Sequence, residues 1–138
     1  MLSQLVYISV RSAECTDQEI EKILESSIRN NGKIDITGVL LYSDQKFLQV
    51  LEGEYKQIIE LYDKIKEDKR HKNVVMLSLG GIKERNFPSW QMGSKKISLD
   101  DVNFNTSMTN EDKQEFKAIL NGKKEQSQKV IEVIKKFF

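Results

Sequence analysis

Short apolar segments with strand-like alternation are interspersed with longer segments of helical period along most of the chain. Gln4 to Ser9 is rich in β-branched residues and predicts a strand. Thr16, followed three residues later by Glu19, forms a capping box and predicts the start of a helix. One face of this helix carries residues at helical spacing, namely Ile20, Ile23, Leu24, Ser27, Ile28 and Asn31. Asn30–Asn31–Gly32 is expected to end the helix.

The rest of the pattern predicts a hairpin, a second helix, two more strands and a helical tail. The hairpin consists of Ile36–Tyr42 and Lys46–Leu51. The apolar face of the second helix is formed by Ile58, Leu61, Tyr62 and Ile65. The later strands are Asn73–Leu79, interrupted or bulged at Gly80–Gly81, and Trp90–Ile97, and two helical stripes follow Thr109. This order predicts a ferredoxin-like βαββαβ α+β sandwich, with an extra fifth strand and two C-terminal helices. In that topology the first and third strands are central neighbours.

Composition narrows the class of protein. The chain has 138 residues, a net charge of +1 and one cysteine, Cys15. This length favours one domain with a short appendage, and the even spread of Lys and Arg argues against a nucleic-acid partner. No apolar run reaches the roughly 18 residues of a membrane helix, and the first residues do not resemble a signal peptide. We therefore expect a cytoplasmic protein with neither a membrane nor a nucleic-acid partner.

Three polar residues occupy positions where the pattern predicts a core. Gln49 lies within the apolar third strand, Tyr7 lies between Val6 and Ile8, and Asn31 extends the apolar stripe of the first helix. A buried amide or hydroxyl needs a hydrogen-bond partner. Each residue has an ordinary explanation: a glutamine satisfied by backbone or water, a core tyrosine, and an asparagine that caps a helix. A polar planar ligand between the first helix and the sheet would satisfy all three together.

A second polar group is predicted near the end of the second helix. Lys64, Asp68 and His71 are spaced i, i+4, i+7, which places them on one helix face. A cation beside a carboxylate and an imidazole could bind a phosphate and a polyol chain. A solvent-exposed helix end with one ion pair is the simpler interpretation of the spacing alone.

Several motifs stand in a characteristic order. They are Tyr7 in the first strand, Asn30–Asn31, the ITGVLLY of residues 36–42, the FLQVLEG of residues 47–53, the DKRH of residues 68–71 and the FPSWQMG of residues 87–93. Together they resemble the BLUF domain, the sensors of blue light using FAD. The resemblance covers residues 1–96, which we expect to be the flavin-binding domain. Residues 97–138 would be a C-terminal helical extension that packs on the sheet.

The resemblance implies a flavin site between the two helices. Asn31 would bind the pyrimidine edge of the ring, Asn30 would flank that edge, and Ile23 and Ser27 would line the slot. Lys64, Asp68 and His71 would hold the ribityl-phosphate arm. FAD is the expected cofactor, although FMN or riboflavin would also fit, and no metal is expected.

The resemblance also implies photochemistry in place of turnover. Tyr7 would give an electron and a proton to the excited flavin, and Gln49 would change its hydrogen bonds. Trp90 and Met92 on the fifth strand would relay this change to the C-terminal helices. The output would be a change in a homo-oligomer or in affinity for a downstream signalling protein.

Other functions fit the sequence less well. A Cys15–His71 dyad would require two distant residues to meet, and no HExxH, CxxC, P-loop or GxGxxG motif is present. The alternative to a light sensor is a flavin-dependent oxidoreductase or a flavin-binding module without photoactivity. A ferredoxin-like RNA module ranks last, because the aromatic and basic signature of such modules is missing.

Overall fold

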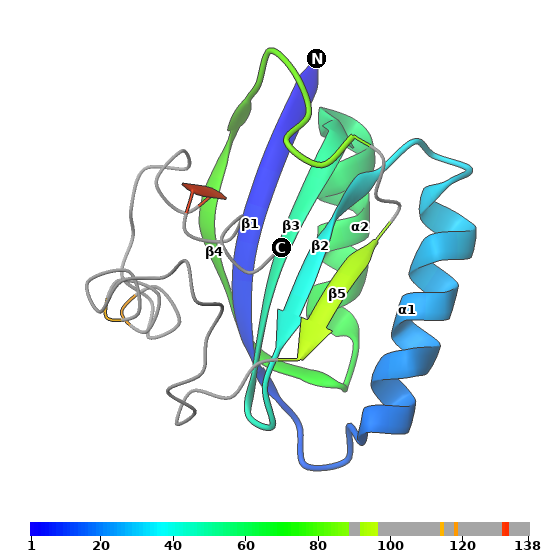
Figure 1. Ribbon diagram of the computed structural model, residues 1–138, viewed down its shortest axis with the longest axis vertical. Coiled ribbons are helices and arrows are strands. Elements are labelled where there is room, and N and C mark those ends of the chain that lie inside the picture. Colours follow the sequence, from blue (N-terminus) through cyan, green and yellow to red (C-terminus); the bar gives the residue numbers. More distant parts are fainter. Residues whose placement is uncertain (89–91, 97–113, 115–117, 119–130, 133–138) are drawn as a thin grey trace.

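The computed structural model describes residues 1–88, 92–96, 114, 118, 131 and 132 (Figure 1). Five strands form one sheet in the order β4-β1-β3-β2-β5. The strands are β1 (Leu2–Arg11), β2 (Thr37–Tyr42), β3 (Lys46–Glu54), β4 (His71–Gly81) and β5 (Gly93–Lys96). Helices α1 (Asp17–Asn31) and α2 (Tyr55–Glu67) cover one face of this sheet. The ferredoxin-like α+β sandwich is confirmed, with the first and third strands as central neighbours.

The register of the sheet decides which side chains face the helices. Tyr7 on β1 lies opposite Gln49 on β3 in an antiparallel pair, and Leu40 on β2 lies on the other side of Gln49. Side chains alternate between the two faces of a strand. Tyr7, Gln49 and Leu40 therefore share the helix-bearing face. Strand β5 adds to β2 in parallel, with Gly93 opposite Val39.

Both faces of the central strands are buried. The helix-bearing face contributes a core cluster composed of Leu5, Tyr7, Cys15, Ile20, Ile36, Leu40, Phe47, Leu51, Ile58, Tyr62 and Met92. The opposite face presents a second buried set, Val6, Ile8, Val39, Leu41, Leu48 and Val50. Strand β3 contributes to both sets, which explains why its sequence is apolar at consecutive positions.

Helix α1 begins as its sequence predicts. The Oγ1 atom of Thr16 accepts a hydrogen bond from the main-chain N–H of Glu19 at 3.3 Å. The Glu19 carboxylate pairs with Lys22 at 3.2 Å. On the predicted face of the helix, Ile20 is fully buried and Asn31 at the helix end is 2% exposed, whereas Ile28 is 46% exposed and does not belong to the buried face.

The fourth strand differs from its prediction. Gly80–Gly81 does not interrupt the fourth strand, because β4 continues through both glycines and pairs with Ser3 and Gln4. The irregularities lie earlier, where β4 has extra residues opposite Val6–Tyr7 and Ile8–Val10. Asn73 lies in the second of these stretches with φ of 50°, a conformation that asparagine tolerates better than most residues.

The predicted C-terminal helices lie largely outside the described residues. Gln114, Ala118, Ile131 and Glu132 are helical, and Ile131 is buried, with 4% of its surface exposed. Of the fifth strand, Gly93–Lys96 is described, whereas Trp90 is not. Within the described part of the chain, no helix has the length and apolar character needed to cross a membrane.

The close approach of β2 to β3 provides a test of the fold. Gly38 has φ of +154°, and a Cβ atom there would lie 1.9 Å from the main-chain oxygen of Val50. Gly38→Ala should therefore lower the free energy of unfolding by about 4 kcal/mol or more, measured by urea denaturation. Gly80→Ala is the matched control, because a Cβ at Gly80 meets no atom within 4 Å. It should change stability by about 1 kcal/mol or less; equal effects of the two variants would contradict this account of the β2–β3 contact.

Candidate flavin site

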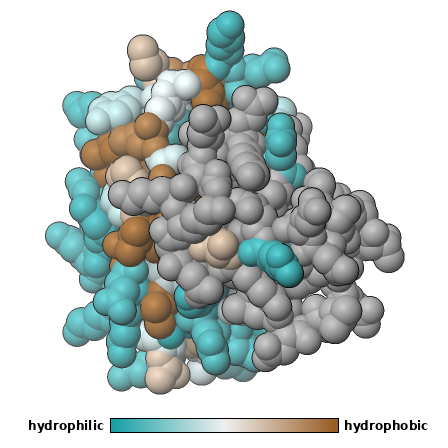
Figure 2. Space-filling model, turned by 90° about the vertical axis from the view of Figure 1, so that its left-hand side faces the viewer, coloured by the Kyte–Doolittle hydropathy of each residue, from teal (hydrophilic) through white to brown (hydrophobic). Residues whose placement is uncertain are grey.

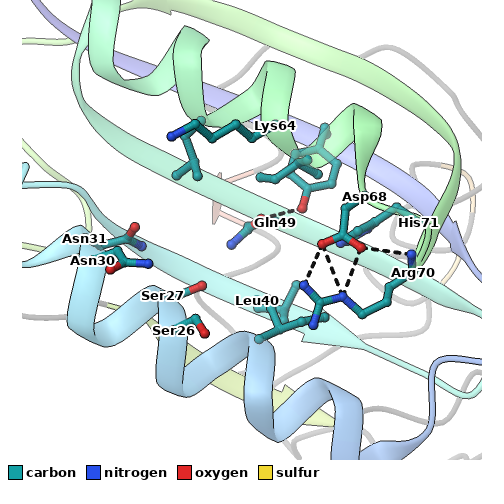
Figure 3. A pocket seen from close by; sticks show the side chains of 14 residues that line it. Ser26, Ser27, Asn30, Asn31, Leu40, Gln49, Lys64, Asp68, Arg70 and His71 are labelled. Atoms are coloured by element: carbon teal, nitrogen blue, oxygen red, sulfur yellow. Dashed lines mark hydrogen bonds and ion pairs between the residues drawn. The ribbon is translucent and has the colours of Figure 1, made fainter.

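A cavity of about 160 Å³ lies between α1 and α2 over the central strands (Figure 3). Helix α1 contributes its polar and apolar residues to one wall, α2 contributes the opposite wall, and β1, β2 and β3 form the floor. The lining consists of Tyr7, Ile23, Ser26, Ser27, Asn30, Asn31, Leu40, Gln49, Leu61, Lys64, Ile65, Asp68, Arg70 and His71. Apolar side chains on both helices, together with polar groups on the floor and at the ends, suit a flat ligand with a polar edge.

A pair of polar side chains forms the centre of the floor. The Tyr7 hydroxyl donates a hydrogen bond to Oε1 of Gln49. The amide Nε2 of Gln49 donates to the sulfur of Met92 at 3.3 Å. Tyr7 is 1% exposed and Gln49 is 5% exposed, so both depend on protein or ligand partners. Because a thioether sulfur is a weak acceptor, the Gln49 amide can exchange this contact for a stronger one.

The C-terminal end of α1 places two amides at one end of the cavity, where Asn30 and Asn31 lie side by side in Figure 3. Asn30 is exposed, whereas Asn31 is buried. The main-chain oxygen of Asn31 accepts hydrogen bonds from the N–H groups of Ile34 and Ile36, at 3.2 and 3.0 Å. These bonds fold the chain from α1 into β2 and fix the helix end against the sheet.

The other end of the cavity is formed by the turn between α2 and β4. Asp68 accepts hydrogen bonds from the main-chain N–H of Arg70 at 3.0 Å and from its guanidinium at 2.6 Å. Nδ1 of His71 lies 2.8 Å from the Ser9 hydroxyl, and the imidazole packs on Phe47 with ring centroids 4.5 Å apart. A carboxylate, a guanidinium and an imidazole therefore meet at this end.

Burial and these contacts set the protonation of the site. Burial raises the pKa of Tyr7 well above its ordinary value, and nearby Tyr62 and Asp68 add to this effect. The side-chain hydrogen bond from Arg70 lowers the pKa of Asp68. Burial lowers the pKa of His71 to about 4, although the Asp68 carboxylate acts in the opposite direction. At neutral pH the site therefore holds a protonated phenol, a carboxylate and a neutral imidazole.

A sequence model of the family described as sensors of blue-light using FAD, BLUF, matches residues 2–93. The chain belongs to the BLUF family.

Other BLUF proteins resemble the chain to different extents. Photoactivated adenylate cyclase subunit beta of Euglena longa is 36% identical over 94 residues, which cover 67% of this chain and 11% of that subunit. The blue light- and temperature-regulated antirepressor BluF of Escherichia coli (strain K12) is 36% identical over 77 residues, 56% of this chain and 19% of that protein. The photo-activated state of BlsA superposes with a TM-score of 0.82 at 29% identity, covering 99% of this chain and 94% of that chain. The chain thus spans a small part of the cyclase subunit but nearly all of BlsA.

The structure brings together all nine residues that the BLUF resemblance assigned to the flavin. They are Tyr7, Ile23, Ser27, Asn30, Asn31, Gln49, Lys64, Asp68 and His71; their contacts with a bound flavin stay a prediction. Met92 contacts Gln49, and Trp90 lies outside the described residues. The sequence analysis did not assign Ser26, Leu40, Leu61, Ile65 or Arg70 to the site. Leu61 and Ile65 could have been assigned from the predicted apolar face of α2, on which they lie. Arg70 could have been assigned from the DKRH motif, which contains it.

One prediction about the site was wrong. Lys64, Asp68 and His71 do not share a helix face, because α2 ends at Glu67, Asp68 has an extended backbone and His71 begins β4. The hydrogen bond from the Arg70 N–H to the Asp68 carboxylate stabilises a turn at this point. Asp68 and His71 lie together, whereas Lys64 extends away from them in Figure 3. The cationic partner of Asp68 is Arg70.

The neutral state of His71 can be tested by titration. Its pKa of about 4 in the folded protein lies below the value of about 6.5 expected in the unfolded chain. The unfolded state therefore binds more protons between these values, and stability that is fully present above pH 6.5 is lost as the pH falls toward 4. The free energy of unfolding should fall by about 3 kcal/mol over this pH range. In His71→Gln most of this pH dependence should be absent, because glutamine does not titrate.

The measurements are urea unfolding at several pH values and NMR of the imidazole protons. The chain has one histidine, so its signal is free of overlap. A midpoint near pH 6.5 in the folded protein would contradict the burial argument.

Proposed function

We propose that the chain binds one flavin non-covalently in the cavity between α1 and α2 and acts as a blue-light sensor. FAD is the expected form, as in the family description, and FMN or riboflavin would also fit. The observation that carries the proposal is the buried hydrogen bond between Tyr7 and Gln49 on the floor of the cavity. A phenol and an amide joined by a hydrogen bond can rearrange that bond when the electronic state of a flavin ring beside them changes.

The lining of the cavity is consistent with a flavin. Ile23 on one helix and Leu61 and Ile65 on the other provide apolar walls for the faces of the ring. The amides of Asn30 and Asn31 match the donors and acceptors along its pyrimidine edge. Arg70 provides a cation for a phosphate at the end formed by Asp68 and His71, and Lys64 provides a second cation elsewhere along the lining. The chemistry of these residues therefore supports a flavin.

The reaction then depends on the protonation of Tyr7. A bound flavin excited by blue light supplies an oxidant. Because burial keeps the Tyr7 hydroxyl protonated at neutral pH, Tyr7 can give up an electron together with its proton. In the structure, Oε1 of Gln49 accepts the hydrogen bond from this hydroxyl, so loss and return of the proton would change the bonding of the Gln49 amide. Gln49 Nε2 could then release the Met92 sulfur, to which it donates in the structure.

The output would pass from Met92 along β5 to the segment after residue 96. The Met92–Gln49 contact and the pairing of β5 with β2 support this route. The cyclase subunit and the antirepressor are named for outputs of their own. For this chain we propose signalling, without catalytic turnover, to a partner protein or within a homo-oligomer. Residues 1–96 would sense light and residues 97–138 would transmit the change.

The chromophore is the direct test of this function. The purified protein should be yellow, and acid or heat should release free FAD, FMN or riboflavin that a column can identify. Blue light should shift the visible absorption band reversibly to longer wavelength. A colourless protein that none of the three flavins reconstitutes would refute the proposal, and a yellow protein without the shift would favour the module without photoactivity.

Two substitutions test the roles of the central pair. Gln49→Leu and Tyr7→Phe should each retain the flavin but abolish the light-induced shift, because each removes one member of the hydrogen-bonded chain at similar volume. Tyr62→Phe is the matched control, because the Tyr62 ring lies 5.7 Å from Tyr7 in the same core and is not part of the cavity lining. Difference spectra recorded before and after illumination measure the effect. A normal shift in Tyr7→Phe, or its loss in Tyr62→Phe, would reassign the electron donor.

A further inference from the structure

A buried carboxylate lies on the other face of β3 from Gln49. Glu52 is 0% exposed, and it does not line the cavity. Its Oε2 atom accepts hydrogen bonds from Gln4 Nε2 at 2.9 Å and from the main-chain and side-chain nitrogens of Asn86 at 3.0 Å. Its Oε1 atom accepts from the main-chain N–H of Phe87 at 2.8 Å. Every donor around Glu52 therefore requires an acceptor, which a carboxylate provides on both oxygens.

Most of these donors belong to the segment that links β4 to β5. The two strands form opposite edges of the sheet, so the link must cross the sheet from one edge to the other (Figure 1). Arg85 anchors the same segment, because its guanidinium donates to Thr37 Oγ1 at 2.9 Å and to the main-chain oxygens of Glu52 at 2.9 Å and Asp35 at 2.7 Å. Residues 85–87 are thus fixed to one end of β2 and β3.

The same segment leads to the sulfur that contacts Gln49. Phe87 is 5% exposed, and Met92, which follows five residues later, is 6% exposed. Gln49 and Glu52 occupy opposite faces of β3, three residues apart in the sequence. The chain therefore connects the Glu52 carboxylate on one face to the Met92 sulfur on the other. A weak N–H···S contact contributes little to the position of Met92. That position depends on the chain on either side of Met92, where β5 pairs with β2 after it and residues 86 and 87 are hydrogen-bonded to Glu52 before it.

We propose that Glu52 is a positioning residue for the Gln49–Met92 contact. By accepting the N–H groups of residues 86 and 87, it fixes the chain shortly before Met92 and helps to keep the Met92 sulfur on the Gln49 amide. Through this contact it sets the balance between the dark and lit arrangements of Gln49. This last step rests on the proposed light-sensing function, whereas the positioning of Met92 in the dark does not.

Glu52→Gln tests the positioning without changing the size of the side chain. The amide replaces one acceptor oxygen with an N–H₂ donor, which must face an existing N–H group. Glu54→Gln is the matched control, because Glu54 lies on the same strand with 64% of its side chain exposed and pairs with the N-terminal ammonium group. In the dark, NMR should show a contact between the Met92 methyl group and the Gln49 amide protons in the unaltered protein and in Glu54→Gln. The contact should be lost in Glu52→Gln.

The lifetime of the lit state tests the coupling to Gln49. Glu52→Gln should change this lifetime by about fivefold or more, the lower range of ordinary coupling between sites. In a Met92→Ala background the same substitution should change it by less than about twofold, because the route through Met92 is already removed. Glu54→Gln should leave the lifetime unchanged in both backgrounds.

The outcomes separate the two proposals. A Met92–Gln49 contact that persists in Glu52→Gln, or a lifetime effect of equal size in the Met92→Ala background, would overturn the role of Glu52. An unaltered protein that gives no light-induced shift would refute the proposed function, while the NMR contact would still decide the positioning. If Glu52→Gln does not fold, Asn86→Ala takes its place, since it removes one donor to Oε2 and leaves the carboxylate. It should then shift the Met92 methyl signal, and an unshifted signal would count against the proposal.

Discussion

The hydrogen bond between Tyr7 and Gln49 ties two polar side chains together in the middle of an apolar layer. Buried polar groups are tolerated only when they have partners, and here the partner is supplied by direct pairing across the two central strands. A slip of one residue between these strands would turn one side chain away from the other. The Tyr7–Gln49 hydrogen bond therefore requires this register of β1 and β3, and the same register places both side chains in the lining of the cavity.

The polar side chains on the two faces of β3 differ in how completely they are hydrogen-bonded. Toward the helices, Gln49 has one strong partner and one weak partner, so its bonding can change at small cost. On the reverse face, Glu52 has a full set of N–H donors around its two oxygens. A well-satisfied buried network is rigid. A rigid anchor on one face beside an adjustable amide on the other is an arrangement suited to transmitting a small change without loosening the sheet.

Several of the polar residues also end secondary structure. Asn31 ends α1, and its main-chain oxygen directs the chain into β2. Asp68 ends α2 by accepting the N–H of Arg70, and the same carboxylate stands beside the buried His71. Because helix ends leave main-chain groups without helical partners, polar side chains gather there. The cavity uses these two helix ends as its polar boundaries.

The sequence by itself determined much of this protein. Alternation and helical spacing located the central strands and both helices, because those patterns record which faces are buried. The order of elements predicted the sandwich, and polar residues in apolar segments identified Tyr7, Gln49 and Asn31. Only the tertiary structure decided the pairing of β5 with β2, the end of α2 before Asp68, and the network around Glu52. These features depend on groups far apart in the chain, such as Glu52 with Asn86, and on competition between a helix and a side-chain turn. The spacing of residues along the sequence predicts neither the contacts between distant residues nor the outcome of that competition.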